Sequence, residues 1–236
     1  LVAKEYRSFV GQYPLPNRHA MTAGELALFF NHEIDIGCEL KVVPMTHWNR
    51  EQWYDETGLP WVPPSPNMPT LNTAVVYPGM CLIEGTQLSE GRGTTRPFEN
   101  FGAPYIDPHK LLQRIESDLD QLPGVIFRPQ FFQPMFQKHG GKACGGLQIH
   151  VTDRNQFKPL LTTIALLRAI AELYPKEFKW RTEPYEFVSD RPAIDLLYGN
   201  TQFRENIETL SLNEIEASWQ EELNRFKEVR NNYLIY

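Results

Sequence analysis

The chain reads Met80-Cys-Leu-Ile-Glu-Gly-Thr-Gln-Leu-Ser-Glu-Gly-Arg-Gly-Thr-Thr-Arg-Pro-Phe98 where a short apolar run ends in a carboxylate and enters a glycine-rich loop. The run from Met80 to Ile83 is typical of a strand buried in a parallel sheet. That strand would place Glu84 at its carboxyl end, where open α/β sheets bind ligands. Three glycines let the following backbone turn tightly and approach a ligand. The segment therefore predicts a site for a polar, anionic small molecule.

The charged side chains of this loop suit two roles. Glu84 and Glu90 have the chemistry of the acid/base or acid/nucleophile pair that cleaves glycosidic bonds. Arg92 and Arg96 offer planar forks for a carboxylate or a phosphate. Neutral hydrogen bonds to sugar-like hydroxyls would come from Thr86, Gln87, Ser89, Thr94 and Thr95. The alternative is structural, with Glu84 and Arg92 forming an ion pair that fastens a long loop.

Composition excludes several classes of partner. The 236 residues are 42% hydrophobic, enough to bury a core, and the net charge of -6 disfavours nucleic acid or an anionic membrane as partner. No apolar run has the length of a membrane span. The glycine loop lacks the GxGxxG spacing and the P-loop lysine of nucleotide sites. The sequence predicts no metal site and no cofactor.

Cysteines and histidines are scattered. Cys38, Cys81 and Cys144 are an odd set at wide spacings, which favours three buried thiols without disulfides. No Cys/His cluster has the spacing of a zinc site. His150 is the histidine that we predict to bind substrate, because it shares one face of a strand with Gln148.

Hydrophobic patterns predict the elements before residue 103. Thr22 and Glu25 form a capping box for a helix that reaches about Ile34. A strand is expected over residues 40–43 and a short helix over residues 69–76. Between them, residues 48–70 are too rich in proline for regular structure, and we expect them to form a wall of the site. In that wall, Ser65 and Asn67 are held rigidly by prolines, either to bind a ligand or to form a stiff turn.

A second segment begins near Gly102-Ala103-Pro104. We expect a helix from residue 107 or 108 to Leu119, strands over 125–127 and 147–151, a helix within 155–174, and an amphipathic helix over 211–233. The sequence therefore predicts an α/β protein with two parts, residues 1–103 and residues 104–236. It has no internal repeat and no low-complexity tract.

Several ordered motifs resemble the NamZ family of exo-β-N-acetylmuramidases, long known as a domain of unknown function. They are Asn17-Arg-His-Ala-Met-Thr-Ala-Gly-Glu-Leu-Ala27, Thr57-Gly-Leu-Pro-Trp-Val-Pro-Pro-Ser-Pro-Asn67, Glu84-Gly-Thr-Gln-Leu-Ser-Glu-Gly-Arg-Gly-Thr-Thr95 and Pro97-Phe-Glu-Asn-Phe-Gly-Ala-Pro104. Cys144-Gly-Gly-Leu-Gln-Ile-His-Val-Thr-Asp153 and Arg230-Asn-Asn-Tyr-Leu-Ile-Tyr236 are similar to the family's second domain. The resemblance covers essentially the whole chain.

The resemblance implies a fold and an activity. Residues 1–103 would be the carboxyl-terminal part of a Rossmann-like catalytic domain, and residues 104–236 a smaller α+β domain. The enzyme would be a glycosidase that releases terminal N-acetylmuramic acid from the non-reducing end of peptidoglycan fragments, in a secreted, periplasmic or cell-envelope setting. Arg92 or Arg96 would hold the lactyl carboxylate beside Glu84 or Glu90.

Family members are much longer, so the resemblance also implies that an upstream half is missing here. That half would carry a Glu-His-Gly loop whose glutamate is a candidate catalytic acid, and the chain alone would then be inactive. Two alternatives remain open. One is a non-catalytic module that binds peptidoglycan or another glycan, and the other is a phosphoryl- or acyl-transfer enzyme that uses the loop as an anion cradle.

Overall fold

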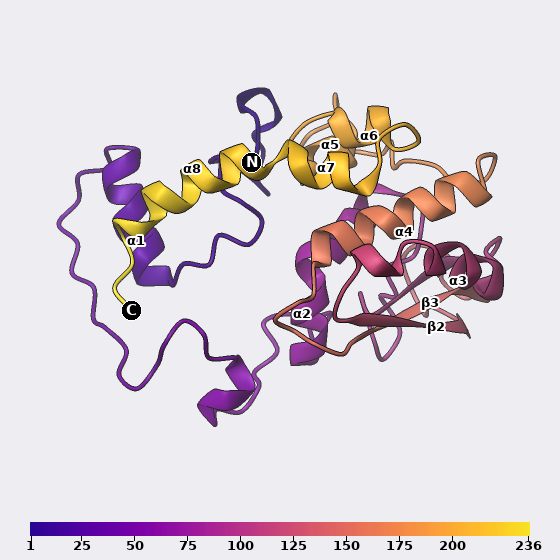
Figure 1. The fold of residues 1–236 in the computed structure, drawn as a ribbon, viewed down its shortest axis with the longest axis horizontal. Helices are drawn as coiled ribbons and strands as arrows, with labels where there is room; N and C mark the ends of the chain where they lie inside the picture. The colour runs from indigo at the N-terminus through magenta and orange to yellow at the C-terminus, as the bar shows by residue number, and fades with distance from the viewer.

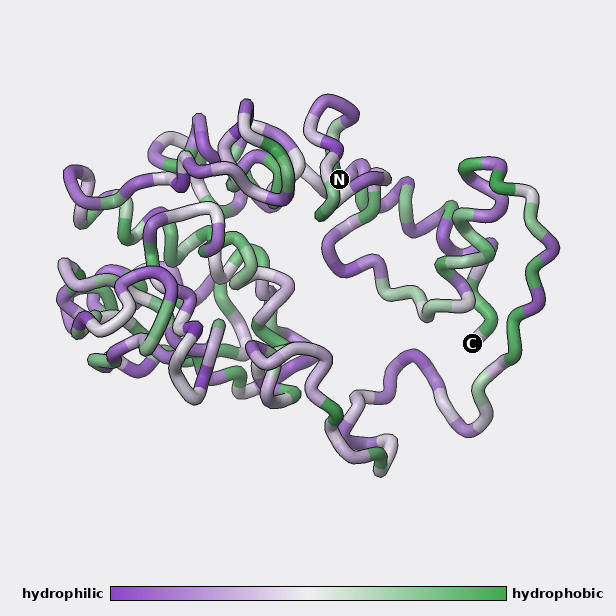
Figure 2. Tube along the Cα trace, turned by 180° about the vertical axis from the view of Figure 1, so that it is seen from behind, coloured by the Kyte–Doolittle hydropathy of each residue, from purple (hydrophilic) through white to green (hydrophobic).

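The computed structural model describes residues 1–236, which form two lobes joined by an arch of chain (Figure 1). The main lobe holds the sheet and helices α2 to α7, and the second lobe pairs α1 with α8. The arch, residues 34–70, contains only one turn of 3-10 helix. Several of its apolar side chains are exposed, among them Ile36, Val43 and Val62, and Figure 2 shows hydrophobic stretches along the arch.

The helices and strands follow one another along the chain. They are α1 (Ala23–Glu33), α2 (Leu71–Met80), β1 (Asn100–Ala103), α3 (Pro108–Glu116), β2 (Val125–Phe132), β3 (Cys144–Val151), α4 (Pro159–Leu173), α5 (Ala193–Tyr198), α6 (Gln202–Asn206), α7 (Leu212–Ser218) and α8 (Gln220–Asn231). Short 3-10 helices cover Lys4–Tyr6, Tyr54–Thr57, Cys81–Gly85 and Leu119–Gln121. The helices predicted after Thr22, after Asp107 and within 155–174 are confirmed, as are the strands over 125–127 and 147–151.

The sheet has three antiparallel strands in the order β1-β3-β2. Leu147 and Ile149 of β3 point into the core, while Gln148 and His150, which alternate with them, are only half-buried. Buried and half-buried side chains alternate in this way when one face of a sheet packs against helices. Here α3 and α4 lie over that face (Figure 1). The predicted division at residue 103 lies within this sheet, because β1 before it pairs with β3 after it.

The main core is one cluster of 31 buried hydrophobic residues. Helix α4 lies at its centre, and its residues from Leu161 to Ala171 are almost all buried. The apolar run predicted to be a strand, Met80 to Ile83, also lies in this core. It forms the last residue of α2 and a 3-10 helix, so the strand prediction is wrong. A four-residue apolar run is buried equally well as helix or strand, and its pattern does not separate the two.

The second lobe has a small aromatic core. Phe29 of α1 and Phe226 of α8 are buried together with Met21, and Tyr233 packs edge-on against Phe29 at 5.3 Å between ring centroids. The buried carboxylate of Glu25 forms the predicted capping box with Thr22 and also accepts a hydrogen bond from Ile235 N at 2.9 Å. The amino-terminal helix α1 thus binds the carboxyl-terminal residues through Glu25 and Phe29.

The helix predicted over 211–233 is divided at Trp219 into α7 and α8. Trp219 packs against the main core, whereas Phe226, two turns later, belongs to the second core. Because of the bend at Trp219, one amphipathic segment packs against both hydrophobic cores.

Two further predictions are wrong. Residues 40–43 form no strand, because no other strand lies beside them to pair with. Cys38 is exposed on the arch, whereas Cys81 and Cys144 are buried as predicted. No helix of the chain combines the length and the apolar character that a bilayer crossing requires.

Candidate functional site

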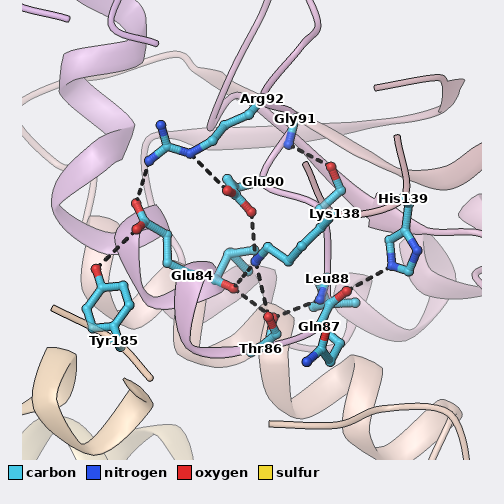
Figure 3. A network of polar contacts seen from close by, with 12 residues as sticks. Glu84, Thr86, Gln87, Leu88, Glu90, Gly91, Arg92, Lys138, His139 and Tyr185 are labelled. Carbon is cyan, nitrogen blue, oxygen red and sulfur yellow. Dashed lines mark hydrogen bonds and ion pairs between the residues drawn. The ribbon is translucent and has the colours of Figure 1, made fainter. Parts of the chain in front are cut away.

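A polar cavity of about 510 Å³ lies where three segments meet. The 3-10 helix Cys81–Gly85 and the loop after it form one side, the β2–β3 loop a second, and the segment before α5 a third. The lining is polar except for one residue and consists of Glu84, Gln87, Glu90, Arg92, Gln137, Lys138, Arg181, Glu183, Tyr185 and Glu186. Figure 3 shows the network of polar contacts in its wall.

The backbone around Glu84 is fixed by close packing. A Cβ on Gly85 would lie 2.8 Å from the Cα of Ile194 in α5, so only glycine lets the 3-10 helix approach α5 this closely. The Glu84 carboxylate is 14% exposed and faces the cavity. It accepts hydrogen bonds from Arg92 Nη2 at 3.0 Å and from the Tyr185 hydroxyl at 3.1 Å.

Glu90 lies deeper than Glu84. Its carboxylate is 3% exposed, and the residue before it, Ser89, pairs with Gly102 beside the sheet. Gly91 follows with φ of 74°, and a Cβ there would lie 2.5 Å from Asn100 O, so the turn requires glycine. This turn directs the side chain of Arg92 back toward both carboxylates.

Arg92 joins the two glutamates. Its Nε donates to Glu90 Oε1 at 2.9 Å and its Nη2 to Glu84 Oε1, while the guanidinium lies 5.0 Å from the ring centroid of Phe98. Burial opposes the charge, but Glu84 and Glu90 outweigh it and raise the pKa of Arg92 above its usual value. The ion pair of the structural alternative is therefore present, with a second carboxylate added.

Lys138 holds Glu90 from the other side. Its Nζ lies 2.8 Å from Glu90 Oε2 and donates to the carbonyl oxygens of Ile83 at 3.0 Å and Thr86 at 3.1 Å. Burial lowers the pKa of Lys138, and the attraction of Glu90 opposes that shift. The β2–β3 loop is also fastened by His139, whose Nε2 lies 2.8 Å from Gln87 O.

Tyr185 closes the network at a tight hairpin. Backbone hydrogen bonds join Tyr185 and Val188 in both directions, and the two residues between them, Glu186 and Phe187, have φ of 46° and 68°. Such turns normally carry Asn and Gly, so two larger residues here are unusual. Burial, together with the nearby Glu84 charge, raises the pKa of the Tyr185 hydroxyl, which stays protonated and donates to Glu84.

Two family models match the chain. The one described as exo-beta-N-acetylmuramidase NamZ, N-terminal, covers residues 1–72, and the one described as exo-beta-N-acetylmuramidase NamZ, C-terminal, covers residues 75–236. The chain belongs to the NamZ family. The resemblance carried by the motifs is thereby confirmed, and the two models meet at the start of α2.

Individual relatives agree. The peptidoglycan beta-N-acetylmuramidase NamZ of Bacillus subtilis (strain 168) is 46% identical over 237 residues, which are 100% of this chain and 55% of that protein. Two crystal structures of DUF1343 family proteins from Bacteroides fragilis NCTC 9343 are each 29% identical, with TM-scores of 0.86 and 0.75. Both align with 100% of this chain and 61% of their own length. The chain thus spans a little over half the length of these relatives and shares their mixed helix and sheet fold.

Four of the predicted site residues meet in the cavity, namely Glu84, Gln87, Glu90 and Arg92. The hydroxyls of Thr86 and Thr94 are used within the loop instead. Thr86 Oγ1 donates to Ile83 O at 2.8 Å, and Thr94 Oγ1 donates to Gly91 O at 2.6 Å. These two threonines therefore shape the loop and do not line the cavity.

The other predicted binding residues lie outside the cavity lining. The Arg96 side chain is 44% exposed, and its Nη1 lies 3.7 Å from Glu99 Oε2. Ser65 and Asn67 form a turn on the arch, where Ser65 Oγ accepts from Asn67 N at 3.3 Å. His150 lies on β3 opposite Ile126. Any role of these residues in binding a ligand stays a prediction.

The cavity residues that come from later segments, chiefly Lys138, Arg181 and Tyr185, were not predicted from the sequence. They lie between 48 and 95 residues from Glu90 in sequence and carry no motif of their own. The one local signal was the Gly140-Gly141 turn, which indicates a loop but not the direction in which Lys138 points. Only the packing of the β2–β3 loop against Gly93 and Gln87 brings that loop to the site.

Proposed function

We propose that the protein hydrolyses the bond that holds a terminal N-acetylmuramic acid at the non-reducing end of peptidoglycan fragments. The observation that carries this proposal is the 46% identity, across the whole chain, to a protein named as a peptidoglycan β-N-acetylmuramidase. The cavity supports it, because about 510 Å³ is within the usual range for small-ligand sites and its polar lining suits a sugar.

Glu84 is the carboxylate that we propose to act on the substrate. It faces the cavity, whereas Glu90 is 3% exposed and lies between Arg92 and Lys138. Glycosidases pass through a transition state with oxocarbenium character, which a nearby carboxylate stabilises. With Arg92 and Tyr185 as its partners, Glu84 suits the part of base, nucleophile or charge stabiliser. Glu90 then positions Arg92 and, through it, Glu84.

Donation of a proton to the leaving oxygen needs a second group. Within the cavity, Glu90 is committed to two cations, so we do not assign this role to it. The family resemblance implies a glutamate in a Glu-His-Gly loop, and we propose that this loop belongs to a Rossmann-like portion of the same enzyme. We also propose a secreted, periplasmic or cell-envelope location, where peptidoglycan fragments are found.

A second candidate function is a module that binds peptidoglycan glycans without cleaving them. One observation favours it, namely that both cavity carboxylates predicted to be catalytic are joined to the same arginine. Such an arrangement holds a ligand pocket in shape without requiring any proton transfer.

One assay separates the candidates. The protein expressed from its complete reading frame is incubated with a chromogenic β-N-acetylmuramide and with the matching β-N-acetylglucosaminide. We expect hydrolysis of the muramide, strongly reduced by Glu84→Gln and unchanged by Glu116→Gln, a substitution at an exposed position of α3. Binding of N-acetylmuramic acid without hydrolysis would establish the second candidate. Neither binding nor hydrolysis would overturn both.

A further inference from the structure

Three cations line the cavity, and two of them are already paired with buried or half-buried carboxylates. Lys138 has three N–H donors. Its Nζ donates hydrogen bonds to Ile83 O and Thr86 O and forms an ion pair with Glu90 Oε2 at 2.8 Å, so three acceptors already surround it. A ligand carboxylate would have to displace one of these buried partners.

Arg92 is also committed. Its Nε and Nη2 donate to Glu90 and Glu84. The two carboxylates together carry more negative charge than the one positive charge of Arg92. A third carboxylate at this guanidinium would meet like charges at short range, which is unfavourable. The prediction from the sequence that Arg92 selects an anionic substrate therefore conflicts with the contacts that it makes.

Arg181 is the remaining cation. No carboxylate lies within 4.0 Å of its guanidinium, and the one hydrogen bond that the side chain makes is from Nη2 to Pro184 O at 3.0 Å. Four of its five N–H donors are thus free. The guanidinium lies 5.2 Å from the ring centroid of Tyr185, and Arg181 N donates to Gly85 O at 2.9 Å. The side chain is therefore anchored while its fork stays open.

Arg181 and Glu84 lie on two sides of the same tyrosine. The ring of Tyr185 supports the Arg181 guanidinium, and its hydroxyl donates to Glu84. A ligand held by Arg181 through an anionic group would thus have its body next to Glu84, which is the arrangement that a sugar with a carboxylate substituent requires.

We propose that Arg181 binds the carboxylate of the ligand and so selects N-acetylmuramic acid over N-acetylglucosamine. This inference rests on the proposed function and names the residue that reads the substrate's lactyl group. An arginine fork holds a carboxylate through two parallel hydrogen bonds, which adds geometric selection to charge attraction.

The charge of the cavity makes a direct contact necessary. Its lining carries four glutamates against Arg92, Lys138 and Arg181, which leaves a net charge of one negative unit. Glu183 is exposed and accepts hydrogen bonds from Gln87 Nε2 at 3.1 and 3.2 Å, so solvent screens much of its charge. Because the overall field does not attract anions, an anionic sugar gains affinity only through a specific pairing.

The test is calorimetric titration of the protein expressed from its complete reading frame, with N-acetylmuramic acid and with N-acetylglucosamine. Arg181→Ala should weaken binding of N-acetylmuramic acid at least about tenfold, the usual scale of a lost charged hydrogen bond. Binding of N-acetylglucosamine should stay within about twofold. Arg181→Lys keeps the charge without the fork and should fall between Arg181→Ala and the unaltered chain.

Arg128→Ala is the matched control, since Arg128 is exposed on β2 and does not line the cavity. It should change neither affinity, and unchanged thermal unfolding of each variant shows that it is folded. If Arg181→Ala binds both sugars as the unaltered chain does, or loses both equally, the inference is overturned while the proposed function stands. If the complete protein binds neither sugar, the inference is overturned, and if it also cleaves neither glycoside, the proposed function falls with it.

Discussion

Replacing Lys138 by methionine should destabilise the chain by about 3 kcal/mol. Removing one partner of a buried ion pair costs about 3–5 kcal/mol, because the other charge is left uncompensated. The lower end applies here, since the Lys138 side chain is 19% exposed and Glu90 keeps its hydrogen bond from Arg92. Ile83 O also keeps two donors from Thr86, so only Thr86 O loses the donor that Lys138 supplied.

Thermal unfolding followed by circular dichroism measures the effect. For a chain of this size, about 1 kcal/mol corresponds to roughly 2–4 °C, so Tm should fall by about 6–12 °C. Lys142→Met, at an exposed position of the same loop, is the control and should leave Tm within about 1–2 °C.

A second variant isolates the cause. If the loss comes from an unpaired buried carboxylate, adding Glu90→Gln to Lys138→Met should restore much of it, so that the two effects are not additive. A change below about 0.5 kcal/mol for Lys138→Met, or simple addition of the two single effects, would refute the account of Lys138 as the cation that neutralises Glu90.

Three other predictions concern single side chains. Glu84→Gln should lower turnover of the muramide by at least about a hundredfold, the scale of lost acid–base help, and near-normal turnover would make Glu84 structural. The raised pKa of Tyr185 means that ionisation above about pH 10 favours the unfolded chain, so stability should fall as pH rises beyond that value. Tyr185→Phe should show a shallower fall in denaturant titrations between pH 9 and 11, and equal slopes would contradict the assignment. In native protein, a thiol reagent should modify Cys38 rapidly and the buried Cys81 only slowly, and equal rates would place Cys81 at the surface.

Local signals in the sequence predicted several elements correctly. The Thr22 and Glu25 capping box formed as expected, because both hydrogen bonds lie within one turn of helix. The helix α4 was predictable because its apolar residues repeat over four turns. The run from Met80 to Ile83 was too short for its pattern to separate strand from helix, and the bend at Trp219 depends on two cores that no local pattern reveals.

The candidate site was predictable only in part, for a similar reason. Glu84, Glu90 and Arg92 lie within nine residues, so one glycine-rich loop brings them together. Lys138 and Arg181 reach the cavity through tertiary packing, and they decide which donors are occupied and which stay free. The sequence therefore indicated an anion site but assigned the anion to Arg92 or Arg96, and in the folded chain Glu84 and Glu90 already neutralise the charge of Arg92.

The most direct measurement of the central claim is a crystal structure of the protein with N-acetylmuramic acid bound. We predict that the sugar occupies the cavity, with its lactyl carboxylate within hydrogen-bond distance of the Arg181 guanidinium and its ring beside Glu84. A sugar bound elsewhere, or one whose carboxylate contacts Arg92 in place of Glu84 or Glu90 while Arg181 stays free, would contradict the account.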